Sequence, residues 1–347
     1  MVSNKKNNLV SSILGSLFLG FLAMLILIPL LFFVTFSFSS ASEIHSFPKA
    51  FLPKLSFDLQ VGYEEERYGL AVKNNEEEYE LKIETNDLNR IKLYLSREFS
   101  VVKTTEELEK DFAPSKNGAP VELNYRKSMF YNFKQFFDIV PGALKGLKNS
   151  LVAAMWTILI STTLGSMAGY ALARFKFKGK EATNLMILIV RMFPSMAISV
   201  PMIVILMKMG LSGSMIGLAI VYSIPNIGLT AWITRSIFGG IGIEMEEASH
   251  VFGASKLQTF MKITFPLALP GLAAAAMYAF LAAWNDSITA LILTPSNPTL
   301  SLAIYKGLGS ADIQLAAAGA IILVIPALVF TFIIKGKLTS LWGDVKV

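Results

Sequence analysis

The sequence predicts an all-α polytopic membrane protein of six transmembrane helices, with a small extracytoplasmic β-containing insert between helices 1 and 2. Three observations lead to this fold class. Hydrophobic residues make up 53% of the chain and charged residues only 16%, and the mean hydropathy is +0.54, which is far too apolar for a soluble protein. The apolar residues form six runs, each about as long as a bilayer requires. One polar stretch separates the first run from the others.

Three domains are expected. Residues 1–41 hold an N-terminal tail and helix 1, residues 42–127 the insert, and residues 128–347 an amphipathic helix with a five-helix core. The chain has no cysteine, which excludes disulfides, thiolate metal sites and cysteine nucleophiles. The insert must therefore be held together by packing.

The first apolar run extends from about residue 9 to residue 40, follows Lys5 and Lys6, and is interrupted only by Pro29. A secretory signal peptide has a shorter apolar core and a small-residue cleavage site. We therefore expect a retained first transmembrane helix.

The insert carries most of the acidic residues, since 18 of the 25 lie between residues 41 and 148. Alternation of polar and apolar residues at 79–84 and again at 91–95 has the period of half-buried strands. A helix is expected near residues 105–112, where Thr104 or Thr105 precedes glutamates. Residues 114–120 are expected to form a loop. The glutamate runs at 64–66 and 76–78 suit a solvated face better than a cation or sugar site.

Residues 128–147 alternate phenylalanines with polar residues, which predicts an interfacial amphipathic helix; a peptide-binding or core helix is the alternative. Five further spans follow, at about residues 149–174, 182–209, 214–236, 266–293 and 314–334.

Lysine and arginine counts orient these spans. With the N-terminus in the cytoplasm, the short outer loops hold only Lys208 and Lys306. The inner segments hold twelve basic residues: Lys5, Lys6, Arg174, Lys176, Lys178, Lys180, Arg235, Lys256, Lys262, Lys335, Lys337 and Lys346. This positive-inside bias predicts that both termini are cytoplasmic and that the insert is outside. The net charge of +6 therefore reflects topology, and no nucleic-acid partner is expected.

Polar residues inside the spans mark candidate functional positions, because burying a charge in hydrocarbon is costly. Arg191 lies about half-way along the third span, and Trp284, Asn285 and Asp286 are consecutive in the fifth. An aromatic ring beside amide and carboxylate groups can hold a sugar. Helix packing, or pairing with a charge on a neighbouring subunit, is an equally good interpretation. His45 and His250 are predicted on opposite sides of the membrane, so no metal site is expected.

Residues 244–271 are the only polar, helix-patterned segment between the C-terminal spans. Glutamates crowd its start, and Gly253 offers a break two turns later. A second short helix, carrying Lys256 and Lys262, is expected to run up to Pro266. Two short helices joined at a glycine would form a cytoplasmic elbow fixed to two spans. The chain contains no P-loop sequence, so energy passing through this elbow must come from another chain.

This segment resembles the EAA loop of the permease subunits of binding-protein-dependent ABC importers, in which E-A-A, three residues, G, nine residues, I, one residue and L-P follow one another. Every spacing is kept, with Ser249 replacing an alanine, Phe265 replacing the leucine, and Phe252 where an aspartate is common. The residues that the resemblance assigns to ATPase coupling are Glu246, Glu247, Ala248, Ser249, Gly253, Ala254, Ile263 and Pro266.

The resemblance extends from about residue 132 to the C-terminus and is closest to the carbohydrate branch of the family, the maltose or maltodextrin (MalG-like) type. Residues 149–151 and 171–179, the Trp284-Asn285-Asp286 segment and residues 343–346 carry it. It implies pairing with a homologous MalF-like permease, two cytoplasmic MalK-like ATPase subunits and an extracytoplasmic solute-binding protein. ATP and Mg would bind to the ATPases, and no cofactor to this chain.

The expected function is therefore a multi-pass permease subunit in the cell membrane, without ATPase activity of its own, that imports a sugar or oligosaccharide. The same class of importer acting on a polyol, a glycerol phosphate or another polar solute is the first alternative. A membrane-anchored receptor or scaffold is the second, although the elbow would then have no purpose.

Overall fold

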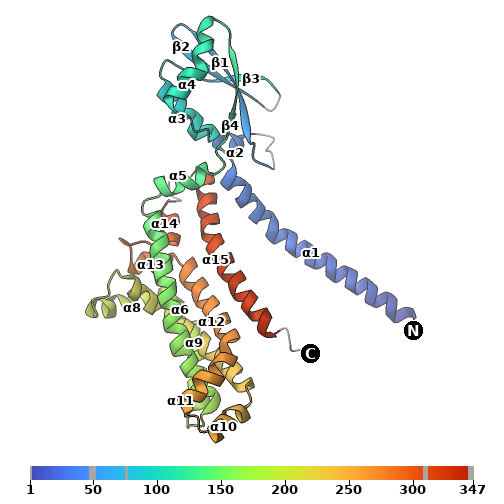
Figure 1. Ribbon diagram of the computed structural model, residues 1–347, viewed down its shortest axis with the longest axis vertical. Helices are drawn as coiled ribbons and strands as arrows, with labels where there is room; N and C mark the ends of the chain where they lie inside the picture. The colour runs from blue at the N-terminus through green and yellow to red at the C-terminus, as the bar shows by residue number, and fades with distance from the viewer. Residues whose placement is uncertain (1, 47–51, 75–76, 308–311, 343–347) are drawn as a thin grey trace. The chain divides into compact units, whose positions relative to one another are not determined.

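The computed structural model of the chain describes residues 2–46, 52–74, 77–307 and 312–342 (Figure 1). Glu76 and the closing segment 343–346 lie outside the described residues. The chain divides into two compact units, Met1–Ile139 with Ser310–Ile322, and Val140–Gly309 with Leu323–Val347.

Five helices among the described residues are long and apolar enough to cross a membrane. They are α1 (Val2–Phe38), α6 (Ala143–Arg174), α9 (Met215–Gly240), the helix that includes α12 (Phe265–Asn285), and α15 (Ile313–Trp342). A sixth span results if α7 (Lys180–Met192) and α8 (Ser195–Lys208), which meet at 95°, are counted as one.

The span expected over residues 182–209 is bent in the structure, because α7 ends at Met192 and α8 begins at Ser195. The cause is Pro194, whose ring disfavours helical backbone at the residue before it, and Phe193 is accordingly extended, with φ −73° and ψ 125°. The run over residues 266–293 is also broken. There α12 ends at Asn285, Asp286 is extended, and the short helices α13 (Ile288–Leu293) and α14 (Leu300–Gly307) follow.

In the second unit α6 packs against both α9 and α12. Gly165 and Gly169 allow this close approach on α6, because a Cβ atom at Gly165 would lie 2.5 Å from Thr230 Cβ on α9. Thr234, opposite Gly169, donates its hydroxyl to the carbonyl oxygen of Thr230 at 2.7 Å, so its polar group is satisfied within α9. Small residues thus set the spacing of the helices on which the elbow stands.

The insert is a four-stranded antiparallel sheet in the order β3-β2-β1-β4. Its strands are β1 (Ser56–Glu64), β2 (Arg67–Lys73), β3 (Tyr79–Thr85) and β4 (Val121–Arg126). The helices α3 (Leu88–Phe99) and α4 (Thr105–Phe112) cover one face of the sheet (Figure 1). Leu59 and Leu70 from the strands and Ile91 and Leu95 from α3 form a closed apolar core. Packing without disulfides is enough to hold this domain.

Two predictions for the insert are confirmed. Residues 79–84 lie in β3, and α4 occupies 105–112 with Thr104 as its cap. The Thr104 hydroxyl accepts from the N–H of Glu107 at 3.2 Å, and the Glu107 carboxylate accepts from the N–H of Thr104 at 2.9 Å. The expected loop at 114–120 begins instead with a 3₁₀ turn, η1 (Ala113–Asn117), and turns at Gly118, whose φ is 88°.

The strand predicted at residues 91–95 is wrong, since these residues lie inside α3. Asp87 caps this helix by accepting from the N–H of Asn89 at 2.8 Å. Ile91, Leu95 and Phe99 then recur every four residues and face the core. A run of five residues fits a period of two and a period of 3.6 almost equally well, and the cap and the longer repeat decide for helix.

The amphipathic stretch 128–147 is divided between two helices. The first is α5 (Tyr131–Ile139), and α6 begins at Ala143. Pro141 cannot donate a backbone hydrogen bond, and Gly142 has a φ of 77°, so the chain turns between them.

Candidate functional site

The elbow consists of two helical arms. The first is α10 (Ile243–Val251), the second begins with α11 (Lys256–Thr259), and Gly253 joins them with a φ of 84°. A capping box starts α11, because the Ser255 hydroxyl accepts from the N–H of Gln258 and the Gln258 side chain accepts from the N–H of Ser255. Only glycine adopts this left-handed turn readily, so the predicted break at Gly253 is confirmed.

The sequence predicted that the second arm ends at Pro266, but in the structure it continues past this residue. A π-helical turn, η2 (Phe260–Thr264), continues it without a break into α12. Pro266 lies in the first turn of α12, directly after the π turn, where a missing N–H is tolerated. The elbow and the membrane helix α12 are therefore one continuous helical segment.

One face of the elbow is exposed. Glu247 and Ala248 lie on it, and the tip carries Val251 and Phe252, which are 85% and 90% exposed. Exposed apolar residues beside a carboxylate are typical of a surface that a protein partner covers. Ala254 and Ile263 are half-buried, and Pro266 is exposed.

The opposite face of the elbow is buried. The hydroxyls of Ser249 and Thr259 lie 2.5 Å apart and hold the two arms together. Glu246, only 7% exposed, forms an ion pair with Arg174 at 2.9 Å. The coupling residues predicted from sequence thus divide into an outer group around Glu247 and an inner group of Glu246 and Ser249.

Sequence reasoning missed the residues that hold Glu246. Arg174 contributed to the positive-inside bias and to the family resemblance of residues 171–179, and no role was predicted for Tyr170 or Thr264. The sequence signal for this pair was weak, because it consists only of Arg174 at the end of one span and Glu246 beside Glu247, 72 residues further along the chain.

The intramembrane polar residues occupy different environments. Trp284 is fully buried, stacks on Phe280 and donates its indole N–H to the carbonyl oxygen of Leu323 at 2.9 Å. Asn285 is exposed. Arg191 is exposed in the last turn of α7.

Asp286 stabilises the break between α12 and α13. Its Oδ1 atom accepts from the N–H of Thr289 at 2.8 Å and from the hydroxyl of Tyr222 at 3.3 Å, and Oδ2 accepts from the hydroxyl of Thr289 at 3.1 Å. A carboxylate in this position begins a helix and fixes the turn before it. Of the three consecutive polar residues, Asn285 therefore has the most accessible side chain.

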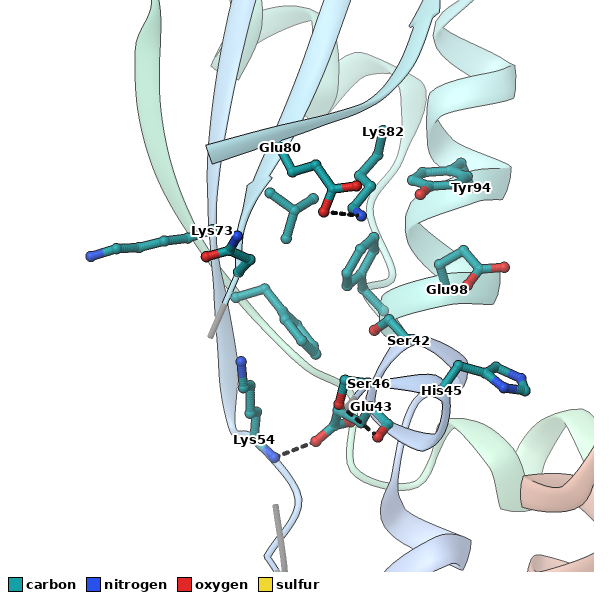
Figure 2. A pocket seen from close by; sticks show the side chains of 14 residues that line it. Ser42, Glu43, His45, Ser46, Lys54, Lys73, Glu80, Lys82, Tyr94 and Glu98 are labelled. Carbon is teal, nitrogen blue, oxygen red and sulfur yellow. Dashed lines mark hydrogen bonds and ion pairs between the residues drawn. The ribbon is translucent and has the colours of Figure 1, made fainter. Parts of the chain in front are cut away.

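The insert contains a pocket of about 480 Å³ between α2 (Ala41–His45), α3 and the sheet. Figure 2 shows the Glu80–Lys82 ion pair, 2.6 Å long, and Tyr94 along one side, with Glu43 and Lys54 along the other. Among the described residues, no group of three or more histidine, aspartate and glutamate side chains is placed to hold a metal ion.

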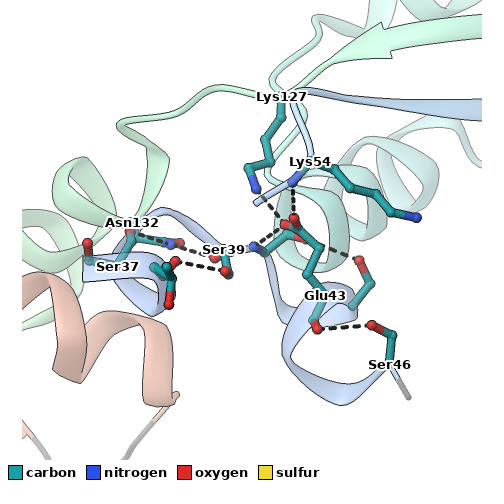
Figure 3. A network of polar contacts seen from close by, with 10 residues as sticks. Ser37, Ser39, Glu43, Ser46, Lys54, Lys127 and Asn132 are labelled. Atoms are coloured by element: carbon teal, nitrogen blue, oxygen red, sulfur yellow. Dashed lines mark hydrogen bonds and ion pairs between the residues drawn. The ribbon is translucent and has the colours of Figure 1, made fainter. Parts of the chain in front are cut away.

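A buried polar network lies beside this pocket (Figure 3). The Glu43 carboxylate accepts from Lys127 Nζ at 2.5 Å, from the N–H of Ser40 at 2.6 Å and from the N–H of Lys54. Burial opposes ionisation of Glu43, but the hydrogen bonds and the lysine charge outweigh it, so the pKa of Glu43 lies below its ordinary value of 4.5. The adjoining Asn132 amide donates to the carbonyl oxygens of Ser37 and Ser39 at 2.9 and 2.8 Å, which ties α5 to the end of α1.

Comparisons with known proteins agree with this architecture. Residues 161–338 match the family described as "Binding-protein-dependent transport system inner membrane component". The trehalose transport system permease protein SugB of Mycobacterium tuberculosis is 34% identical over 59% of this chain and 79% of its own length. The maltodextrin transport system permease protein MdxG of Bacillus subtilis is 30% identical over 65% of this chain and 82% of its own.

A crystal structure of a bacterial ABC transporter involved in the import of the acidic polysaccharide alginate includes a chain with the same fold. The TM-score is 0.58 at 17% sequence identity, over 94% of this chain and 96% of that one. The family match extends from within α6 to near the end of α15 and includes the elbow. The chain therefore belongs to the binding-protein-dependent transport system inner membrane components, and it is a multi-pass permease subunit of an ABC transporter.

Proposed function

We infer that this subunit imports a sugar or oligosaccharide, of the maltose, maltodextrin or trehalose kind, through an ATP-driven complex. The observation that carries this proposal is the elbow, whose outer face presents Glu247, Val251 and Phe252 to a partner while its second arm continues into a membrane helix. The printed names of two relatives, a trehalose and a maltodextrin permease, support the class of cargo.

The proposed complex contains a second, MalF-like permease, two MalK-like ATPase subunits and an extracytoplasmic solute-binding protein. The outer face of the elbow docks on one ATPase, where ATP and Mg bind. Closure of the ATPase pair then moves α12 through its continuous connection to the elbow. This movement switches access to the pathway from outside to inside.

For the pathway we propose Asn285 and Arg191, with Trp284 and Asp286 behind them. Asn285 and Arg191 have exposed side chains in this chain, and amide and guanidinium groups bind sugar hydroxyls. Trp284 and Asp286 hold the break after Asn285 and so position its amide. Asn285→Ala is expected to reduce uptake more than Arg191→Gln if the cargo is an uncharged sugar.

Co-purification from the native membrane tests the proposal. We expect mass spectrometry of the tagged chain to identify a homologous permease, a P-loop ATPase and a sugar-binding protein. In the purified complex, Glu247→Lys and Gly253→Pro should abolish coupling between ATP hydrolysis and uptake, because the first reverses a charge on the outer face and the second removes the left-handed turn. Unchanged uptake in both variants would contradict the docking role.

The same importer acting on an anionic solute such as a glycerol phosphate is the second candidate, favoured by the exposed guanidinium of Arg191 in α7. An equilibrium binding screen on the cognate binding protein, with trehalose, maltose, maltotriose, a polyol and glycerol phosphate as ligands, separates the two. Recovery of the tagged chain with signalling proteins only would support an anchored receptor.

A further inference from the structure

Glu246 and Glu247 are neighbours in the elbow, but their side chains have opposite surroundings. Glu247 is exposed, whereas Glu246 is only 7% exposed and directed into the protein. A buried carboxylate is costly unless charged and hydrogen-bonding partners surround it. The partners of Glu246 therefore indicate what this residue does.

These partners come from two helical segments outside the first arm. Arg174, at the end of α6, contacts Glu246 Oε1 through Nε and Nη2, both at 2.9 Å. Tyr170, one turn earlier on α6, donates its hydroxyl to Oε2 at 3.2 Å. Thr264, in the π turn that leads into α12, donates its hydroxyl to Oε1 at 3.0 Å.

The arginine also connects a third helix. Arg174 Nη2 donates to the carbonyl oxygen of Ile241, the residue directly after α9, at 3.0 Å. An apolar cluster surrounds this connection, with Tyr170 between Phe238 of α9 and Phe260 of η2 at ring-centroid distances of 5.3 and 4.9 Å. The carboxylate of the first arm thus fastens α10 to the cytoplasmic ends of α6, α9 and α12 at a single point.

We propose that the Arg174–Glu246 ion pair is the joint that makes the elbow and these three helices move as one body. Both are positioning residues: they contact neither cargo nor ATPase, and they act by keeping the outer face of the elbow fixed to the membrane helices. This inference rests on the proposed function, because it requires that an ATPase docks on the elbow and that its movement passes from the elbow to the membrane helices. Without the pair the elbow still docks and stays joined to α12 through η2, but its movement no longer reaches α6 and α9.

Purified complexes in proteoliposomes test this inference through uptake per ATP hydrolysed, with trehalose, maltose and maltotriose as probes. We expect Glu246→Gln and Arg174→Gln to lower this ratio about tenfold while the ATPase subunits co-purify normally. The double variant with Arg174→Glu and Glu246→Arg should recover part of it, because it restores the ion pair but not the hydrogen bond to the Ile241 carbonyl oxygen. Glu244→Gln is the matched control, because Glu244 lies on the same helix with an exposed side chain.

A second measurement does not depend on the cargo. The chain has no cysteine, so Lys176→Cys after α6 and Lys256→Cys on the second arm give a unique pair of spin-label sites, both exposed. The distance distribution between them should be narrow in the parent complex, broad with Glu246→Gln, and narrow again in the charge-swapped variant.

The outcomes separate the two hypotheses. Normal uptake per ATP in Glu246→Gln, or an unchanged distance distribution, would overturn the inference. Loss of ATPase co-purification in Glu246→Gln would overturn it as well, because that residue would then belong to the docking face. If the parent complex takes up none of the three sugars, the proposed cargo fails, while the spin-label distances still test the joint.

Discussion

Glu43 and Lys127 form a charge pair inside the insert, with side chains 8% and 1% exposed. Removing one member leaves the other charge buried and unpaired, which typically costs about 3 to 5 kcal/mol. We therefore expect Lys127→Ala to destabilise the insert by about 3 kcal/mol. The Glu43→Gln and Lys127→Met double variant should lose much less.

Thiol protection measures this loss in the full-length protein. Ser115 is buried in the turn η1, and the chain is free of cysteine, so Ser115→Cys supplies a single reporter of opening. A loss of about 3 kcal/mol, at about 1.4 kcal/mol per factor of ten, raises the population of the open insert more than about a hundredfold. In the Lys127→Ala background the reporter should therefore react with a disulfide reagent faster by that factor. An equal rate in both backgrounds would show that the pair contributes nothing.

The same carboxylate predicts an acid response. The pKa of Glu43 is lower in the folded insert than its ordinary value of 4.5. A depressed carboxyl pKa stabilises the fold at every pH above 4.5, and this stabilisation is lost as the pH falls from 4.5 through the folded-state pKa. Burial lowers the pKa of Lys127 from its ordinary value of 10.5, although the hydrogen bond and the charge of Glu43 oppose this shift. Reaction of the Ser115→Cys reporter with 4,4′-dithiodipyridine should rise in this acid window, with a smaller rise in Glu43→Gln.

Among the elements, the contact between α6 and α9 depends on residues without side chains. A larger residue at Gly165 would meet Thr230, and overpacking of this kind costs about 1 to 3 kcal/mol. We expect Gly165→Leu to lower the melting temperature and the monodisperse yield of the purified protein. Gly239→Leu on α9 is the control, because a Cβ atom there meets nothing within 4 Å. Equal melting temperatures for the two variants would mean that α6 and α9 can move apart to accommodate the larger side chain at little cost, which would contradict the prediction.

Sequence patterns predicted these elements unevenly, for physical reasons. Hydropathy located the apolar runs because each is a longer continuous apolar stretch than a helix of a soluble protein usually has. The breaks at Pro194 and Asp286 depend on the backbone chemistry of single residues, which an average of hydropathy over a window does not detect. Alternation over 91–95 was too short to distinguish strand from helix. The turn at Gly253 was predictable because left-handed backbone selects glycine. The burial of Glu246 was not, since its partner Arg174 is distant in sequence and becomes a neighbour only when α6 and α10 meet.

At the scale of the whole molecule, the distribution of basic residues predicts how the chain crosses the membrane. Lys92 in α3 should be outside the cell, and Lys178, between α6 and α7, inside. In intact cells a membrane-impermeant maleimide should label Lys92→Cys, and it should reach Lys178→Cys only after permeabilisation. Both positions are exposed in the structure, so burial does not confound the result. The reverse pattern would invert the topology and move the elbow away from any cytoplasmic ATPase.

The continuous helix from Lys256 to Asn285 has a mechanical consequence. Thirty residues at about 1.5 Å each make a rod of about 45 Å, as long as a bilayer with its headgroups is thick. A rod pivoting near one end converts a small tilt into a large sideways displacement at the other. This rod ends at Asn285, where Asp286 breaks the backbone, so the largest displacement falls at the exposed amide of Asn285.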